Sequence, residues 1–173
     1  TWTLRATAIT NSGTVIPSIA ANSVVDEFQN KNAASTSTDN TVVYDITPPT
    51  VSFSSLTPSN PSQSLTPNIV GTASEPSTVT LYYDSGCSAT KSATVANTVF
   101  ASPGVTPNAN VAADTTTTIY AKATDTAGNV SACTSLVQYV HDGTGPSVTS
   151  VTSTLADGPY KAGQAIPVFV NFN

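Results

Sequence analysis

Hydrophobic and polar positions alternate in several short stretches of the chain, and clusters of Pro, Gly, Asn and Asp separate these stretches. In residues 77–84 the alternation places Val79, Leu81 and Tyr83 on one face, opposite a mixed face. One apolar face is the pattern of a strand in a β-sandwich. Similar stretches rich in β-branched and aromatic residues predict further strands at residues 50–55, 68–72, 115–124 and 131–140.

A helical pattern is missing from the sequence. No window of helical length keeps an apolar stripe with a period of 3.6 residues. Residues 20–30 come nearest, but Asn22, Ser23 and Asn30 interrupt the stripe. We therefore predict an all-β protein with almost no helix.

An internal repeat predicts how the chain is divided. Residues 45–51 (DITPPTV) align with residues 142–148 (DGTGPSV), which lie 97 positions later. Each copy follows a turn-like segment that begins with Asp and ends with Asn, at residues 26–30 (DEFQN) and 125–129 (DTAGN). A period near 100 residues is the size of one β-sandwich domain.

This repeat predicts one complete module at residues 47–143. Residues 1–46 are then the C-terminal part of a preceding module, and residues 144–173 are the first strands of a following one. Residues 2–10 (WTLRATAIT) and the alternating residues near position 173 both have the pattern of strands. Neither end segment is long enough to bury a core of its own. We expect each to be completed by further chain or by another copy.

Composition excludes some classes of function. Only 9% of the side chains are charged, the net charge is -5, and Thr and Ser together supply about 50 residues. The chain has five Lys and Arg residues in total, which are too few to form a basic surface for nucleic acid. The sequence contains no apolar run long enough for a membrane helix, so we expect no membrane insertion. The abundance of Val, Ile and Thr argues against disorder.

Three motifs carry a family resemblance: residues 44–51 (YDITPPTV), residues 71–83 (GTASEPSTVTLYY) with Cys87 just beyond them, and residues 120–133 (YAKATDTAGNVSAC). They resemble the immunoglobulin-like repeats of very large bacterial surface and adhesin proteins. Residues 12–21 and 33–39 look like the back half of a sister repeat type. That sister repeat has Gly where this chain has Gln29, so we expect an irregular turn at residues 26–30.

The resemblance implies tandem immunoglobulin-like β-sandwich modules, one complete and two partial. It also implies an extracellular location at the bacterial cell surface and a stalk role without enzymatic activity. Other copies of the chain or neighbouring immunoglobulin-like modules are the expected partners, together with a host or cell-surface ligand.

Two cysteines fall within residues 47–143. In a Ser/Thr-rich, Lys-poor β protein of extracellular type, Cys87 and Cys133 are expected to form a structural disulfide. Buried free thiols and a reactive thiol remain alternatives. Because no Trp lies between them, the bridge would differ from the inter-sheet disulfide of antibody domains. We expect it to join the end of strand 77–84 to the last strand.

Calcium is the one candidate cofactor, and none is certain. The segment 125–129 offers Asp125 and Asn129, whose carboxylate and amide oxygens are calcium ligands, while Asp45 and Asp142 occur at the predicted joints. Asp84 and Asp114 could approach from other loops. The alternative is that these side chains cap turns, as Asp and Asn commonly do.

His141 is the only histidine and does not indicate catalysis. It stands next to Asp142, but adjacent residues of a strand point to opposite faces, and no nucleophile motif precedes it. We expect a solvated residue at a joint. Tyrosines on the predicted strands are expected to pack in the core, with a platform for sugar as the alternative.

A mechanical function is the leading hypothesis. Pro48 and Pro49 at one joint, and Gly145 and Pro146 at the other, would set a semi-rigid angle between modules, because Pro restricts the backbone and removes a donor.

Two alternatives remain. One is a fibre subunit in which residues 164–173 of one copy complete residues 1–46 of the next by donating a strand. The other is a module that binds a glycan or a receptor, for which the Thr run at residues 115–118 is the only hint. The strand-donor candidates alternate along the last segment: Ile166, Val168, Val170 and Phe172.

Overall fold

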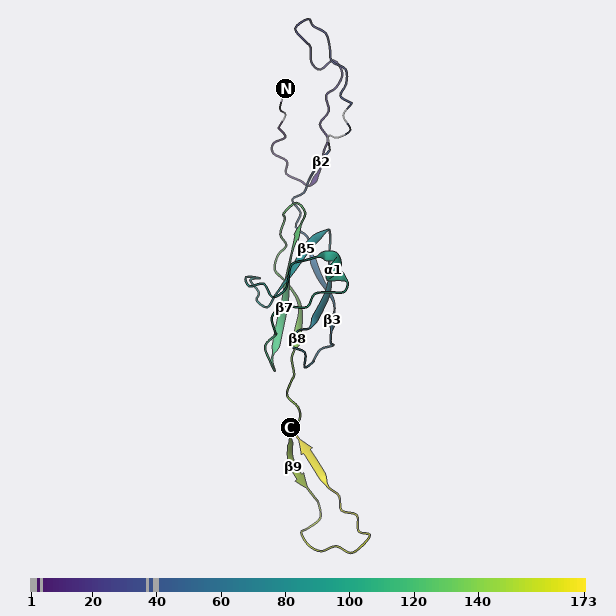
Figure 1. The fold of residues 1–173 in the computed structure, drawn as a ribbon, viewed down its shortest axis with the longest axis vertical. Coiled ribbons are helices and arrows are strands. Elements are labelled where there is room, and N and C mark those ends of the chain that lie inside the picture. The colour runs from purple at the N-terminus through teal and green to yellow at the C-terminus, as the bar shows by residue number, and fades with distance from the viewer. Residues whose placement is uncertain (1–2, 4, 37, 39–40) are drawn as a thin grey trace.

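The computed structural model describes residues 3, 5–36, 38 and 41–173, so Trp2 of the predicted first strand lies outside the described residues. The chain is elongated, with an N-terminal segment, a central part and a C-terminal hairpin following one another along the long axis (Figure 1). The prediction of an all-β protein is confirmed. The strands are β1 (Gly13–Val15), β2 (Val42–Tyr44), β3 (Val51–Thr57), β4 (Asn68–Ala73), β5 (Ser77–Tyr82), β6 (Val95–Ala96), β7 (Thr116–Asp125), β8 (Thr134–Val140), β9 (Val148–Thr152) and β10 (Phe169–Phe172), and the single helix described is α1 (Asn97–Ala101).

The central part, residues 47–143, contains two antiparallel sheets that share one core. Strands β3 and β4 form a two-stranded sheet, and the second sheet has the order β6-β5-β7-β8. The five strands predicted from alternation correspond to β3, β4, β5, β7 and β8. Ile69 from the first sheet and Leu81, Ile119 and Tyr139 from the second are fully buried in the same apolar cluster. Burial of each such side chain stabilises the fold by about 1.5–3 kcal/mol.

Helix α1 supplies a core residue that the pattern did not predict. Phe100 is fully buried and lies over Gly71 of β4, where an added Cβ atom would come within 2.3 Å of the Phe100 Cζ atom. A side chain at position 71 would therefore displace the ring. The short helix escapes prediction because five residues do not complete an apolar stripe.

The disulfide predicted between Cys87 and Cys133 is confirmed, with 5.8 Å between the two Cα atoms. Cys87 follows the end of β5, and Cys133 directly precedes β8. The bridge thus joins the end of one strand to the start of the last strand of its sheet, as expected. It closes a loop that contains β6, α1 and β7.

Replacing both cysteines with Ala tests the contribution of this bridge. Because a cross-link over 46 positions restricts the unfolded chain, we expect the double variant to lose about 4 kcal/mol in the free energy of unfolding. Urea denaturation, followed by far-ultraviolet circular dichroism of the backbone, measures this loss. An unchanged unfolding midpoint would contradict this role for the disulfide.

The turn at residues 26–30 has the same hydrogen bonds as the turn at residues 125–129. In the first, Asp26 Oδ1 accepts the backbone N–H groups of Phe28 and Asn30 at 2.9 and 2.8 Å. In the second, the corresponding Asp accepts from the corresponding two positions, both at 2.8 Å. In each turn the side-chain amide of the Asn donates to the other oxygen of the same Asp.

The expectation of an irregular turn at Gln29 is wrong. Gln29 adopts a φ of 65°, in the same left-handed region as Gly128 with a φ of 94°. The hydrogen bonds to Asp26 determine the conformation of the turn, and Gln29 therefore adopts a backbone conformation that favours glycine.

The hairpins β3–β4 and β9–β10 also begin alike. The N–H group of Thr50 donates to Ser74 Oγ at 2.9 Å, and the Thr50 carbonyl accepts the Ser74 N–H at 3.0 Å. Ser147 has the same pair of bonds with Asn173, at 2.8 and 3.1 Å. At the start of both hairpins, a side-chain oxygen, of Ser74 in one and of Asn173 in the other, therefore accepts the first N–H of the ladder in place of a backbone carbonyl.

Two details of the end segments differ from the predictions. Among the described residues of the predicted first strand, residues 5–10 form no strand, because no neighbouring strand pairs with them. In the last segment only Val170 and Phe172 of the alternating residues belong to β10, while Ile166 and Val168 precede it. Strand β10 pairs with β9 of the same chain.

Candidate functional site

The two predicted joints lie at opposite ends of the central part. Pro48 and Pro49 precede β3, and Pro49 is fully buried. Gly145 and Pro146 lie between β8 and β9. The chain therefore enters the central part at one end and leaves it at the other (Figure 1).

Asp45 connects the N-terminal segment to the central part. Its Oδ1 atom accepts the Ser12 hydroxyl at 3.0 Å and the backbone N–H of Thr47 at 2.9 Å. Its backbone carbonyl accepts the side-chain amide of Asn129 at 3.1 Å. The turn at residues 125–129 of the central part is thus bonded directly to the joint.

Three carboxylates gather at this first joint. Ligand oxygens of Asp45, Glu75 and Asp125 lie within 4.8 Å of one another. Asp45 comes from the joint, Glu75 from the β4–β5 connection and Asp125 from the end of β7. No signal in the sequence pointed to Glu75, because its proximity depends on how β4 and β5 are paired with their neighbours.

The pKa values of Asp125 and Glu75 are shifted in opposite directions. Asp125 is only 7% exposed, and this burial opposes ionisation, but hydrogen bonds from the Asn129 side chain and from the N–H groups of Asn129 and Ala127 hold its pKa below the usual value. Burial, and then the charges of Asp45 and Asp125, raise the pKa of Glu75. Glu75 is therefore the carboxyl that a nearby cation would relieve most.

The three carboxyl groups of this cluster are the right kind of ligand for a hard cation, but they are too few to complete its coordination. Carboxylate oxygens are the ligands that Ca²⁺ prefers, although it needs six to eight oxygens. Asn129, a predicted ligand, presents its amide nitrogen to Asp45 and Asp125, so here it acts as a hydrogen-bond donor. Asp142 does not belong to the cluster, because it lies at the other joint.

The second joint is held by Asp114. Its Oδ1 atom accepts the backbone N–H of Gly143 at 2.7 Å, and its Oδ2 atom accepts the Thr144 hydroxyl at 3.1 Å. The bond from Gly143 is the main reason why the pKa of Asp114 lies below its usual value. Asp142 accepts the Thr144 N–H at 3.2 Å and so caps the same turn.

The expectation that His141 is solvated is wrong. Its side chain is buried, with the residue 6% exposed. The Nδ1 atom accepts the backbone N–H of Asp114 at 2.9 Å, and Nε2 lies 3.1 Å from the carbonyl of Gln63, to which it donates. The imidazole therefore connects two loops to the end of β8 and stabilises the exit of the chain.

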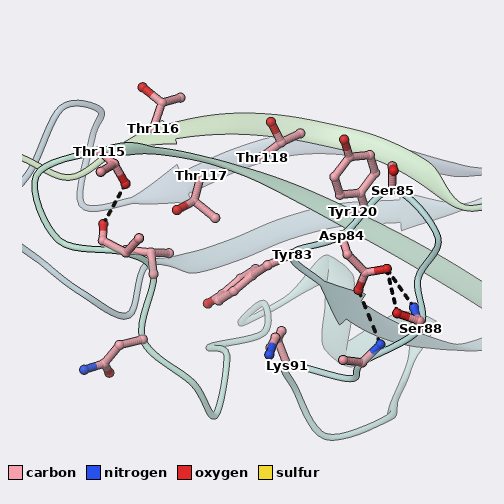
Figure 2. Close-up of a pocket in the computed structure, with 14 residues that line it drawn as sticks. Tyr83, Asp84, Ser85, Ser88, Lys91, Thr115, Thr116, Thr117, Thr118 and Tyr120 are labelled. Carbon is pink, nitrogen blue, oxygen red and sulfur yellow. Dashed lines mark hydrogen bonds between the residues drawn. The ribbon is translucent and has the colours of Figure 1, made fainter.

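A cleft of about 690 Å³ lies beside β7 (Figure 2). Residues 115–118 line it together with Tyr83, Asp84, Lys91 and Tyr120. Asp84 accepts the Ser88 N–H at 2.9 Å, and this bond is the main reason why its pKa lies below the usual value. Asp84, a further calcium candidate, thus caps a turn.

The aromatic rings of this cleft do not form one flat platform. Figure 2 shows Thr117 on the side of β7 that faces Tyr83, whereas Thr116, Thr118 and Tyr120 point away from it. The Tyr83 hydroxyl donates to the carbonyl of Ala109 at 2.7 Å, and burial raises the pKa of this Tyr to about 12. Lys91 Nζ lies 5.9 Å from the centroid of the same ring. The Tyr83 face and hydroxyl are therefore already engaged within the chain.

No protein-family model, curated protein or solved structure matches the chain. The helix in the described part of the chain is too short to span a membrane.

Replacing Glu75 with Gln tests the electrostatics of the acidic cluster. Since the folded state raises the pKa of Glu75 above its usual value, the stability that its neutral form contributes is present at low pH and is lost as pH rises through the folded pKa. We expect the variant to melt at a higher temperature than the wild type at neutral pH, and at an equal temperature near about pH 3.5. Glu27→Gln, outside the cluster, is the control. A lower melting temperature at neutral pH would contradict this assignment.

The calcium prediction has its own measurement, thermal unfolding with and without millimolar Ca²⁺. If the cluster holds calcium, the ion raises the melting temperature of the wild type, and Glu75→Gln reduces that rise. Asp142→Asn, at the other joint, keeps the rise. Identical melting curves in calcium and in chelator would eliminate the site.

Proposed function

We propose that the chain is a non-catalytic structural part of an extracellular bacterial surface protein, in which tandem immunoglobulin-like β-sandwich modules form a stalk or spacer. The observation that carries this proposal is the position of the two joints. The chain enters the central part beside the turn at residues 125–129 and leaves it beside His141, at opposite ends. Modules joined in this way follow one another along a line.

The sheet arrangement supports an immunoglobulin-like central module at residues 47–143. Two antiparallel sheets cover one core, and consecutive strands β3 and β4 lie in one sheet while β7 and β8 lie in the other. The repeated hydrogen bonds support further modules on both sides. The turn at residues 26–30 matches the one at 125–129, and the start of β9–β10 matches the start of β3–β4.

Both joints have features that suit a spacer. At each joint a carboxylate accepts hydrogen bonds from both sides, Asp45 at the first and Asp114 at the second. Prolines at positions 48, 49 and 146 restrict the backbone and remove donors that could pair with a neighbouring sheet. A semi-rigid joint of this kind maintains a direction between neighbouring modules.

The disulfide suits a protein that carries load in an oxidising environment. When the two ends of the central part are pulled apart, the Cys87–Cys133 bridge prevents the residues between them from extending. Disulfides persist mainly outside the cytosol, which supports an extracellular location.

Small-angle X-ray scattering of the full chain tests the extended arrangement. A compact domain of 173 residues has a radius of gyration of about 16 Å. We expect a clearly larger value and a distance distribution with a long tail, as for a rod. The double variant Pro48→Gly and Pro49→Gly should broaden that distribution, whereas Pro159→Gly, in the β9–β10 connection, should not. A radius close to the compact value would refute the stalk proposal.

A further inference from the structure

The outer edge of β8 is hydrogen-bonded at the end where the chain leaves the central part. Strand β8 is the last in the order β6-β5-β7-β8, so the sheet itself leaves the backbone groups of this edge without partners. Residues 60–62, which lie shortly after β3, bond four of these groups in succession. The four are the Gln138 carbonyl, the N–H and the carbonyl of Val140, and the Asp142 N–H. A loop segment therefore acts as an additional strand beside the exit of the chain.

The side chain of Asn60 takes the place of a backbone peptide group in this contact. Its Oδ1 atom accepts the Val140 N–H at 2.7 Å, and its Nδ2 atom donates to the Gln138 carbonyl at 2.9 Å. A side-chain amide offers a donor and an acceptor, as a peptide group does. Ser62 continues the pairing through its backbone, with bonds of 3.2 Å to the Val140 carbonyl and 3.0 Å from the Asp142 N–H. The edge is therefore bonded without a gap from Gln138 to Asp142.

Two buried side chains at the end of β8 bind the same loop segment from the core side. The Tyr139 hydroxyl donates to the carbonyl of Ser64 at 2.7 Å, and His141 Nε2 donates to the carbonyl of Gln63 at 3.1 Å. Tyr139 is fully buried and His141 is only 6% exposed. We call residues 60–64 and residues 138–142 together the clamp. Six hydrogen bonds join its two halves.

The clamp is the direct link between the segment that enters the central part and the segment that leaves it. In the described part of the chain, its six bonds are the only hydrogen bonds between residues 47–73 and residues 134–143. Strand β3 pairs with β4, and β8 pairs with β7, so neither ladder connects the two segments. Their other connection is the packing of the apolar core, which has no preferred direction.

A pull on the two ends of the chain loads the clamp along its axis. Residues 60–64 run parallel to residues 138–142, as the bridge between Ser62 and His141 shows. The first half is pulled through β3 toward the entry joint, and the second half is pulled toward the exit joint at the opposite end (Figure 1). The two halves are therefore drawn along each other in opposite directions. All six bonds then share the load, whereas in a hairpin pulled open from its ends they would break one after another.

We propose that the clamp is the force-bearing contact of the central part and sets how long this part stays folded under tension. The inference rests on the proposed function, because a stalk transmits a pull between its two ends. Resistance to forced unfolding depends on the rate of unfolding, so the contacts that must break first determine it. The Cys87–Cys133 bridge has a different role, since it limits how far the chain extends after the clamp has broken.

Holding the full chain by its two ends at constant force in magnetic tweezers tests the proposal. The measured quantity is the lifetime of the folded central part. Its unfolding is recognised by the length released, because only residues 47–86 and 134–143 lie outside the disulfide loop and extend, by up to roughly 170 Å at about 3.5 Å per residue. We expect Tyr139→Phe, which removes one bond of the clamp, to shorten the lifetime about fivefold at a given force.

Tyr83→Phe is the matched control for Tyr139→Phe. The Tyr83 hydroxyl also donates to a backbone carbonyl at 2.7 Å, that of Ala109, but this bond lies outside the clamp. In urea without force, both variants should unfold at a lower midpoint than the wild type. Under force, only Tyr139→Phe should shorten the lifetime. An equal shortening by Tyr83→Phe would show that the loss is one of general stability and would overturn the proposal.

Asn60→Ala gives a second test that leaves the core untouched, because Asn60 is exposed. It removes two bonds of the clamp, so we expect the lifetime to fall about tenfold or more. Asn68→Ala is its control, since the Asn68 amide donates to the carbonyl of Pro103 at 2.8 Å, outside the clamp. A lifetime of Asn60→Ala equal to that of the wild type, or to that of Asn68→Ala, would contradict the assignment.

Failure of this inference can be told apart from failure of the proposed function. The radius of gyration from X-ray scattering reports the shape of the chain without any applied force. An extended chain whose lifetime under force does not respond to the clamp variants would eliminate the clamp but leave the stalk proposal intact. A compact radius would refute the stalk proposal, whatever the lifetimes under force.

Discussion

The hydrogen bond from a backbone N–H to a short side-chain oxygen is the interaction on which this structure depends. Strand ends and turns leave donors that the ladders do not satisfy, and an unpaired buried donor is costly. Asp125 satisfies two of them in its turn, Ser131 satisfies Ala123, and Ser74 satisfies Thr50. A chain that uses these oxygens so often can be rich in Ser, Thr, Asn and Asp while it carries few charges.

The same interaction holds the two joints at the ends of the central part. Asp45 and Asp114 each accept hydrogen bonds from residues on the joint, so the conformation of the joint depends on a carboxylate and not on a large apolar interface. Hydrogen bonds from N–H groups compensate the burial of Asp125, whose pKa they hold low. Among the described residues no N–H group donates to the Glu75 carboxyl, which lies beside two other carboxyls, so its charge is unfavourable at the first joint.

Packing is distributed unevenly along the chain. The central part combines a buried apolar cluster with a disulfide, whereas the hairpins at both ends keep their apolar side chains largely exposed. Equivalent positions therefore have opposite environments: Ala123 is buried where Val24 is exposed, and Val51 is buried where Val148 is exposed. The hydrogen bonds of the end segments therefore match those of the central part, whereas the burial of the corresponding side chains does not.

By itself, the sequence determined the main strands of the central part. Alternation predicts β3, β4, β5, β7 and β8 because side chains alternate between faces along every strand, and the Asp-to-Asn segments predict their turns because those bonds are local. The pairing of the two cysteines was likewise predictable, since only two occur.

Only the tertiary structure decided which distant residues meet. It brought Glu75 to Asp45 and Asp125, left Asp142 at the other joint, buried His141 against Gln63, and placed Phe100 over Gly71. Each of these contacts depends on strand order and on the path of the loops, and no local pattern of residues encodes either of them. For the same reason the sequence predicted an apolar strand near position 170, whereas only the tertiary structure decided that β9 of the same chain is its partner, so that the edge of β10 facing β9 is already hydrogen-bonded.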